Sequence, residues 1–241
     1  MGTDVLLTIN SGSSLLKTEA IFQRLWKEIE KFDKRFSRFR QDSEITQLNQ
    51  NAGQWFVVSS ELKELLKVTL EMAKKTDGLF NPFILPALNR AGYISSWVPT
   101  ELTANPPDYS TRQVVGYEQL EISGSKTRIP ADSAIDIGGI GKGYLLQNLS
   151  KIVESTDETN YWFSLGGDII ARGVDAQKEP WRIQVADSAN PSNSIAEVKV
   201  LSDHAIAITT SGTTKRNGKQ NGNGWHHIIN PKKGEPANNN I

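Results

Sequence analysis

Apolar residues recur at helical spacing in three stretches of the chain. Within each stretch the hydrophobic positions lie three or four residues apart, so they share one face of a helix. The first stretch predicts a long helix from Leu15 to about Phe36. A second predicted helix follows Ser59 and Ser60, which can cap its first turn, and ends at residues 76–78. The third has apolar positions from 145 to 153 and follows a glycine-rich turn.

Other stretches have the pattern of strands. Two of them, Trp181 to Val185 and Ala196 to Val200, alternate apolar and polar residues, which is typical of antiparallel strands with one solvated face. A Gly-Gly turn after the apolar run Tyr161 to Leu165 indicates a hairpin. Further strands are predicted at residues 5–9, 55–58, 114–122, 126–129 and 205–209, whereas 217–224 is expected to be an exposed polar loop. Helices mixed with mostly antiparallel strands predict an α+β fold.

The amino-acid composition argues against several classes of protein. A chain of 241 residues, 37% of them hydrophobic, can bury a sizeable core. Lys plus Arg and Asp plus Glu both number 27, so no broad electric field favours nucleic acid or an anionic membrane. The absence of cysteine excludes a disulfide framework and a thiolate zinc site. No apolar run approaches the roughly 18 residues of a spanning helix, and the polar residues after Met1 argue against a signal peptide.

The glycine-rich turn Asp136-Ile137-Gly138-Gly139-Ile140-Gly141-Lys142-Gly143-Tyr144 precedes the third helix. Bare backbone N–H groups and the positive end of a helix dipole suit a phosphate there. Asp136 adds a carboxylate and Lys142 a cation. The sequence fits neither a Walker A loop, because Asp136 occupies the place of its first glycine, nor a dinucleotide fingerprint, because Tyr144 occupies the place of its last. A phosphate site and a purely conformational need for glycine both remain open.

Other candidate chemistry is weaker. His226 and His227 would point to opposite faces of a strand, so at most one of them serves a given site as general base. The run Phe36-Ser37-Arg38-Phe39-Arg40 either stacks on a base and holds phosphate or ends an amphipathic helix. No His/Glu spacing indicates a transition metal, and a hard cation such as Mg²⁺ remains open.

The order of these motifs resembles the ApbE family of flavin transferases, whose members use FAD to attach FMN covalently to a Thr or Ser of a target protein. The resemblance covers nearly the whole chain and implies a single ApbE-like domain over residues 1–241. The motifs that carry it are Met1-Gly2-Thr3, FSRFR, Ser43-Glu44, Leu48-Asn49, TDGLFNP, DIGGIGKGY, SLGGDI, the tryptophan strand, TTSG, HIINP and Gly234.

The resemblance also implies roles for individual residues. Those expected to contact FAD are Met1, Phe39, Leu79, Phe80, Asn81, Asp136, Lys142 and Ile229. The Gly139 carbonyl is expected to help hold Mg²⁺, and His227 to help deprotonate the acceptor hydroxyl. That hydroxyl would attack the FMN-side phosphorus of FAD and AMP would leave, while Mg²⁺ and Lys142 neutralise charge on the pyrophosphate.

The chain departs from the family pattern near its end. Asn81 and Asn230 stand where the family commonly has Asp, and the family's segment with the Asp and Thr metal ligands would follow Ile241. Two alternatives therefore stay open: an FAD pyrophosphatase that yields FMN and AMP, and a non-catalytic FAD-binding protein. The expected partner is an acceptor flavoprotein and not nucleic acid. The resemblance implies action in the cell envelope, with membrane association through an N-terminal anchor, and a cytoplasmic location remains open.

Overall fold

The computed structural model describes residues 2–96, 100–190, 192–200, 202–214, 216–220 and 223–238. These residues form two compact units. The first contains Gly2, residues 32–141 and residues 212–238, and the second contains residues 3–31 and 142–211. Helices α1 (Leu15–Phe36) and α5 (Gly138–Glu154) contribute residues to both units. Helix α1 lies where the sequence predicts it, whereas α5 begins at Gly138, inside the stretch that was expected to be a turn before the helix. Whether the chain is one domain over residues 1–241 stays a prediction.

The second unit is built on a four-stranded antiparallel sheet with the order β1-β5-β6-β9. Its strands are β1 (Val5–Ile9), β5 (Tyr161–Leu165), β6 (Asp168–Arg172) and β9 (Ile206–Ile208). The predicted Gly-Gly hairpin joins β5 to β6, and Gly166 and Gly167 have φ of 62° and 95°. A side chain at Gly166 would collide with the Thr3 hydroxyl, so this turn requires glycine.

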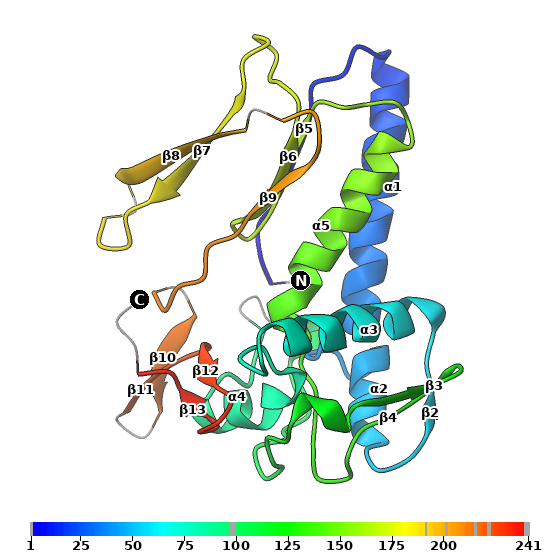
Figure 1. Cartoon of the computed structure of the whole chain (residues 1–241), viewed down its shortest axis with the longest axis vertical. Helices are drawn as coiled ribbons and strands as arrows, with labels where there is room; N and C mark the ends of the chain where they lie inside the picture. The colour runs from blue at the N-terminus through cyan, green and yellow to red at the C-terminus, as the bar shows by residue number, and fades with distance from the viewer. Residues whose placement is uncertain are drawn as a thin grey trace. The chain divides into compact units, whose positions relative to one another are not determined.

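Strands β7 (Trp181–Ala186) and β8 (Ser194–Val200) form the predicted antiparallel pair. Figure 1 shows this hairpin projecting away from the four-stranded sheet. Its base is anchored because Ile183 and Val200 are buried together with Ala171 of β6. The other residues of β8 are exposed.

Helices dominate the first unit. They are α2 (Glu44–Gln50), α3 (Ser60–Lys75) and α4 (Leu85–Ala91), with short 3₁₀ turns η1 (Pro82–Ile84), η2 (Glu101–Thr103) and η3 (Tyr117–Gln119). Ser59 caps α3 as predicted, because its hydroxyl accepts a hydrogen bond from the Leu62 N–H at 3.1 Å. The predicted apolar face of α3 is buried and includes Leu62, Leu65, Leu66 and Ala73.

Small antiparallel sheets complete the first unit. One has the order β2-β4-β3, from β2 (Phe56–Val57), β4 (Lys126–Arg128) and β3 (Glu121–Ser123). Two hairpins follow near the end of the chain: β10 (Asn217–Gln220) with β11 (Asn223–His226), and β12 (Ile229–Asn230) with β13 (Glu235–Pro236). The expected loop at 217–224 was therefore wrong, since most of it pairs as β10 and β11. Gly218 opposes Trp225 there, and the absence of a side chain at Gly218 leaves room for the indole.

Two further strand predictions were wrong. Residues 114–122 contain η3 and only the start of β3. The mostly apolar run at residues 134–137 has the pattern of a strand end, but it is buried without being part of a sheet. Its backbone groups bond elsewhere: the Asn49 side chain donates to the Ile135 carbonyl at 2.9 Å and accepts from the Ile135 N–H at 2.8 Å. The Asp136 N–H donates to the Pro82 carbonyl at 2.8 Å.

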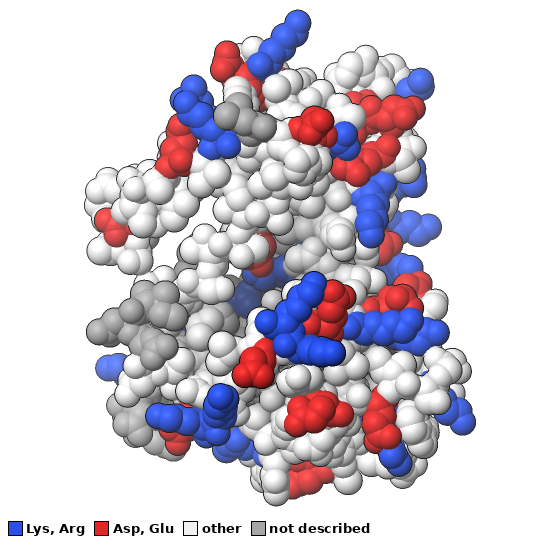
Figure 2. Space-filling view, viewed as in Figure 1, with Lys and Arg blue, Asp and Glu red and all other residues white. Residues whose placement is uncertain are grey.

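The α+β class is confirmed by the helices and antiparallel sheets of the two units. Within the described residues, no helix combines the length and the apolar character needed to cross a bilayer. Figure 2 shows basic and acidic side chains interspersed on the visible face, which agrees with equal numbers of the two charges in the sequence.

Asn49 should be a stability determinant of the first unit. Its side chain is fully buried and satisfies both backbone groups of Ile135. Replacement Asn49→Leu leaves a buried N–H and a buried C=O unpaired, so we expect the free energy of unfolding to fall by about 2–4 kcal/mol. Denaturant titration of the protein without ligand measures this. The control is Asn51→Ala, at an exposed residue whose side chain bonds the Gln47 carbonyl, where we expect a loss below about 1 kcal/mol. Equal losses would contradict the prediction.

Candidate active site

The side chain of Asp136 is hydrogen-bonded to the start of helix α5. One carboxylate oxygen, Oδ1, accepts a hydrogen bond from the Gly138 N–H at 2.6 Å. The other, Oδ2, accepts from Arg38 Nε at 2.7 Å, and both side chains are almost fully buried. The carboxylate therefore fixes the geometry of the turn that the sequence singled out as a phosphate site.

Arg38 connects that turn to Tyr93, which follows helix α4. Its Nη2 donates to the Tyr93 carbonyl oxygen at 2.9 Å. Its guanidinium carbon lies 4.2 Å from the ring centroid of Phe39 and 4.6 Å from that of Tyr93. Burial lowers the pKa of Arg38, and the neighbouring Asp136 carboxylate acts in the opposite direction by favouring the charged form.

Tyr93 is the centre of a group of rings. Phe39 meets it edge-on at a centroid distance of 5.7 Å, and the indole of Trp225 stacks on it at 5.9 Å with an interplanar angle of 25°. The imidazole of His227 approaches Tyr93 edge-on at 6.3 Å. We call Phe39, Tyr93, Trp225 and His227 the aromatic cluster. Planar rings of this kind suit a flat heterocyclic ligand.

The TDGLFNP loop lies beside the glycine-rich turn. A Cβ added at Gly139 would be 3.1 Å from the ring of Phe80, so this ring packs closely against the first turn of α5. Asn81 is buried, donates to the Val115 carbonyl at 2.8 Å and accepts from the Phe83 N–H at 2.9 Å. Leu79 is largely exposed. Ile229 is buried against Ala87 and Leu88, which places it in the core of the unit.

The two histidines have different surroundings. His226 Nε2 lies 3.0 Å from the Ala237 carbonyl, while its Nδ1 is buried without a described partner. His227 Nδ1 lies 3.3 Å from the carbonyl of Arg216. A ring nitrogen that faces a carbonyl must carry the proton, so a neutral His227 has its lone pair on Nε2.

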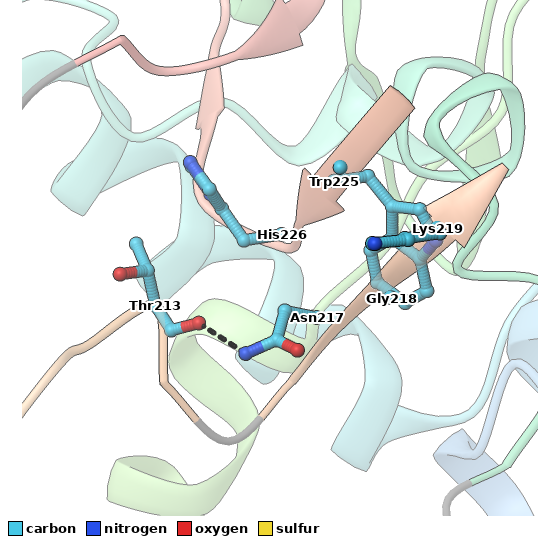
Figure 3. Close-up of a pocket in the computed structure, with 7 residues that line it drawn as sticks. Thr213, Asn217, Gly218, Lys219, Trp225 and His226 are labelled. Atoms are coloured by element: carbon cyan, nitrogen blue, oxygen red, sulfur yellow. Dashed lines mark hydrogen bonds between the residues drawn. The ribbon is translucent and has the colours of Figure 1, made fainter. Parts of the chain in front are cut away.

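A cavity of about 400 Å³ opens at the β10–β11 hairpin. It is lined by Thr213, Asn217, Gly218, Lys219, Gly224, Trp225 and His226. Figure 3 shows Asn217 beside Thr213, whose carbonyl oxygen accepts its side-chain N–H at 2.7 Å. The cavity shares Trp225 with the aromatic cluster.

In the second unit Lys142 is paired with an acid. Its ammonium forms an ion pair with the carboxylate of Asp168, the residue directly after the Gly-Gly turn. Lys142 is thereby held in the first turn of α5, and about a quarter of its side chain remains exposed.

The described acidic and histidine side chains do not cluster into a metal site. Among the described residues, no group of three or more His, Cys, Asp or Glu side chains could hold a metal ion. Asp136, the acid of the turn, makes one hydrogen bond through each of its oxygens. A Mg²⁺ ion held at this turn would therefore take its ligands from backbone carbonyls and from substrate oxygens.

The sequence model of the ApbE family matches residues 1–241. The chain belongs to the ApbE family. An FAD:protein FMN transferase from Vibrio cholerae is 28% identical over 232 residues, which cover 95% of this chain and 67% of that protein. One from Escherichia coli strain K12 is 22% identical over 238 residues, with the same two coverages.

Solved structures of the family share the fold. The ApbE protein from Thermotoga maritima has a TM-score of 0.82 and 27% identity, and the match covers 98% of this chain and 75% of that one. A mutant of the flavin transferase ApbE from Vibrio cholerae has a TM-score of 0.75 and 25% identity, with coverages of 99% and 76%.

The structure of this ApbE-family chain brings some of the predicted site residues together. In the first unit, Asp136, Gly139, Phe39, Phe80 and His227 lie on or near the connected network of turn, Arg38 and aromatic cluster. Met1 lies outside the described residues, and Lys142 belongs to the second unit. The individual contacts to FAD and to Mg²⁺ stay predictions.

Sequence reasoning missed three residues of this network. Arg38 was noted as a phosphate ligand or a helix end, whereas it pairs with Asp136. The sequence analysis singled out neither Tyr93 nor Trp225, although their rings stack in the structure. The available signal was an isolated Trp next to the histidine pair, but no periodicity links it to Tyr93.

Gly139 and Gly143 form a matched pair for testing the contact between Phe80 and the turn. Both lie in the first two turns of α5, yet a Cβ at Gly143 would meet no described atom within 4 Å. We expect Gly143→Ala to stabilise the protein by about 0.5–1 kcal/mol, because alanine favours helix. Gly139→Ala should lack this gain, since the Phe80 ring must shift.

Thermal unfolding of the protein without ligand compares the two glycine variants. Adding Phe80→Leu to Gly139→Ala should recover the gain. Equal stabilisation by the two single replacements would show that the ring does not press on the turn.

Proposed function

We propose that this chain is an FAD:protein FMN transferase that moves FMN from FAD to a Thr or Ser hydroxyl of an acceptor flavoprotein, with release of AMP and in dependence on Mg²⁺. The observation that carries the proposal is the family match over residues 1–241, within a family whose relatives in two bacteria are named FAD:protein FMN transferases.

The first unit offers a surface suited to the flavin end of the substrate. Phe39 and Tyr93 are held by stacking on Arg38, so a planar ring that binds beside them meets side chains that are already ordered. Leu79, exposed next to Phe80, is proposed to cover the same ligand. Asn81 and Ile229 are proposed to act through their backbone, because the Asn81 side chain already bonds Val115 and Phe83, and that of Ile229 is buried.

The glycine-rich turn suits the pyrophosphate. Helix α5 begins at Gly138, and the partial positive charge of a helix start favours an anion. Asp136 is neutralised by Arg38, so its charge repels an arriving phosphate less than a bare carboxylate would. Lys142 belongs to the same glycine-rich motif and adds a cation.

The proposed reaction is a phosphoryl transfer. The acceptor oxygen forms a bond to the FMN-side phosphorus, and the bond from that phosphorus to the bridging oxygen breaks, so AMP leaves with the electron pair. The hydroxyl proton passes to a base, for which His227 is the proposed candidate through Nε2. Lys142 is proposed to stabilise negative charge that builds up on the phosphate oxygens.

Mg²⁺, when bound, would neutralise charge on the pyrophosphate. The Gly139 carbonyl is the proposed protein ligand, and oxygens of FAD would supply other ligands, since Mg²⁺ is often held by one or two protein groups together with substrate phosphates. Action in the cell envelope belongs to the same proposal and is supported by the resemblance of the motifs to the family.

An assay with and without an acceptor protein tests the function. Purified protein, FAD and a Thr-containing acceptor flavoprotein are incubated with Mg²⁺ or with chelator, and mass spectrometry follows the acceptor. We expect acceptor mass to increase by one FMN, with AMP released in equal amount, and the rate to fall at least about tenfold with chelator.

Other products would identify the alternatives. Free FMN and AMP at the same rate without acceptor would show a pyrophosphatase, in which water replaces the hydroxyl. FAD binding without any product would show a non-catalytic flavin-binding protein. Either result would overturn the transferase proposal.

Lys142 and Lys151 provide a matched pair on helix α5, one at its first turn and one in its last. We expect Lys142→Met to lower kcat for FMN transfer by about 10²–10³-fold, because it removes a cation aimed at developing charge. Lys151→Met should change kcat by less than about twofold. A third variant, Asp168→Asn, frees Lys142 from its ion pair while keeping its charge, and should lower the rate less than Lys142→Met. A normal kcat in Lys142→Met would remove Lys142 from the proposed chemistry.

A further inference from the structure

Arg38 and Asp136 are two nearly buried charges that neutralise each other. The Arg38 Nε lies 2.7 Å from Asp136 Oδ2, and each side chain is at most 9% exposed. Removing one partner of such a pair leaves the other charge buried and uncompensated, which destabilises a protein by several kcal/mol. Neither residue can therefore be considered without the other.

The guanidinium of Arg38 makes four contacts at once, two hydrogen bonds and two ring contacts. It donates from Nε to Asp136 and from Nη2 to the Tyr93 carbonyl, and it stacks on the rings of Phe39 and Tyr93. Only a planar group with several divergent N–H donors can do this. A lysine has one ammonium and no flat surface, so it can replace the charge but not the geometry.

Both carboxylate oxygens of Asp136 form hydrogen bonds to the protein. Oδ2 meets Arg38 and Oδ1 accepts the Gly138 N–H, the first N–H of helix α5. A carboxylate held this way sets the conformation of the turn.

We infer that Arg38 is a positioning residue of the flavin site. It holds Asp136 against the Gly138 N–H and holds Phe39 and Tyr93 in place, so the glycine-rich turn and these two rings are ordered before FAD binds. The inference rests on the proposed function, and it assigns to Asp136 an anchoring task at the start of helix α5.

The experiment compares Arg38→Lys, Arg38→Met, Asp136→Asn and the double variant Arg38→Met with Asp136→Asn. The control is Arg128→Lys, because Arg128 also pairs with a carboxylate, that of Glu121, and stacks on a ring, that of Trp55, but at the surface. Four quantities are measured for each: the Kd for FAD by calorimetry, KM and kcat for FMN transfer, and the Gly138 amide resonance in a ¹⁵N spectrum without FAD.

Positioning predicts a specific pattern. Arg38→Lys should raise Kd and KM for FAD about tenfold, with kcat at saturating FAD within about threefold of wild type. The Gly138 amide should move in Arg38→Lys and in both Asp136 variants. A residue needed only for folding would lower the amount of active protein and leave Kd, KM and the Gly138 amide of the folded fraction unchanged. Arg128→Lys should leave all four quantities unchanged.

The double variant tests the coupling even where a single variant folds poorly. Asp136→Asn should lower the midpoint of thermal unfolding in the wild-type background and raise it in the Arg38→Met background, because it then removes an unpaired buried carboxylate. Lowering by the same amount in both backgrounds would show that the two residues act independently, which overturns the inference.

Failure of the inference and failure of the proposed function give different results. Wild-type protein that binds FAD but transfers no FMN would reject the function, and the Kd values and the Gly138 amide would still decide the task of Arg38. Conversely, normal transfer with an unchanged Kd and KM in Arg38→Lys would reject only the inference. Loss of kcat with unchanged Kd and an unmoved Gly138 amide in Asp136→Asn would also reject it, because Asp136 would then act in the chemistry. Wild-type protein that binds no FAD overturns both.

Discussion

The buried contact between Arg38 and Asp136 is the constraint on which the rest of the candidate site in the first unit depends. Two charges removed from water are tolerated only when they are paired and hydrogen-bonded, and here each of them also orders a neighbouring element. Asp136 fixes the first N–H of helix α5, and Arg38 fixes the Tyr93 segment and the ring of Phe39. A single ion pair thereby links the glycine-rich turn to the aromatic cluster.

This arrangement changes how the glycine-rich turn is understood. In the sequence, Asp136 and Lys142 stand at the two ends of the turn, and both are candidates to contact the same phosphate-bearing ligand. The structure instead gives each a protein partner: Arg38 for Asp136, and Asp168 for Lys142. Such pairs keep charged groups oriented before the substrate arrives, which reduces the ordering that binding must supply. They also leave the Gly138 N–H at the helix start already bonded to Asp136, so a phosphate there would meet the helix dipole with one free N–H fewer.

Much of the secondary structure followed from local pattern. The helices at 15–36 and 60–75, the part of α5 after residue 144 and the Gly-Gly hairpin were predicted because periodicity, caps and turn glycines are local signals. The failures occurred where tertiary contacts replaced local ones. Residues 134–137, apolar apart from Asp136, are buried like a strand, but their backbone bonds to Asn49 and Pro82. The polar run at 217–224 pairs as a hairpin because Gly218 makes room for Trp225.

The sequence by itself determined the α+β class, the family through the order of its motifs, and the turn at Asp136 to Tyr144 as the place where helix dipole and bare N–H groups could meet a phosphate. Only the tertiary structure decided which side chains surround that turn. Arg38, Tyr93 and Asp136 are separated by tens of residues, and no spacing rule connects them. Their pairing follows from the high free-energy cost of burying a charge without a partner, a constraint that acts between elements once they pack and leaves no periodic pattern in the sequence.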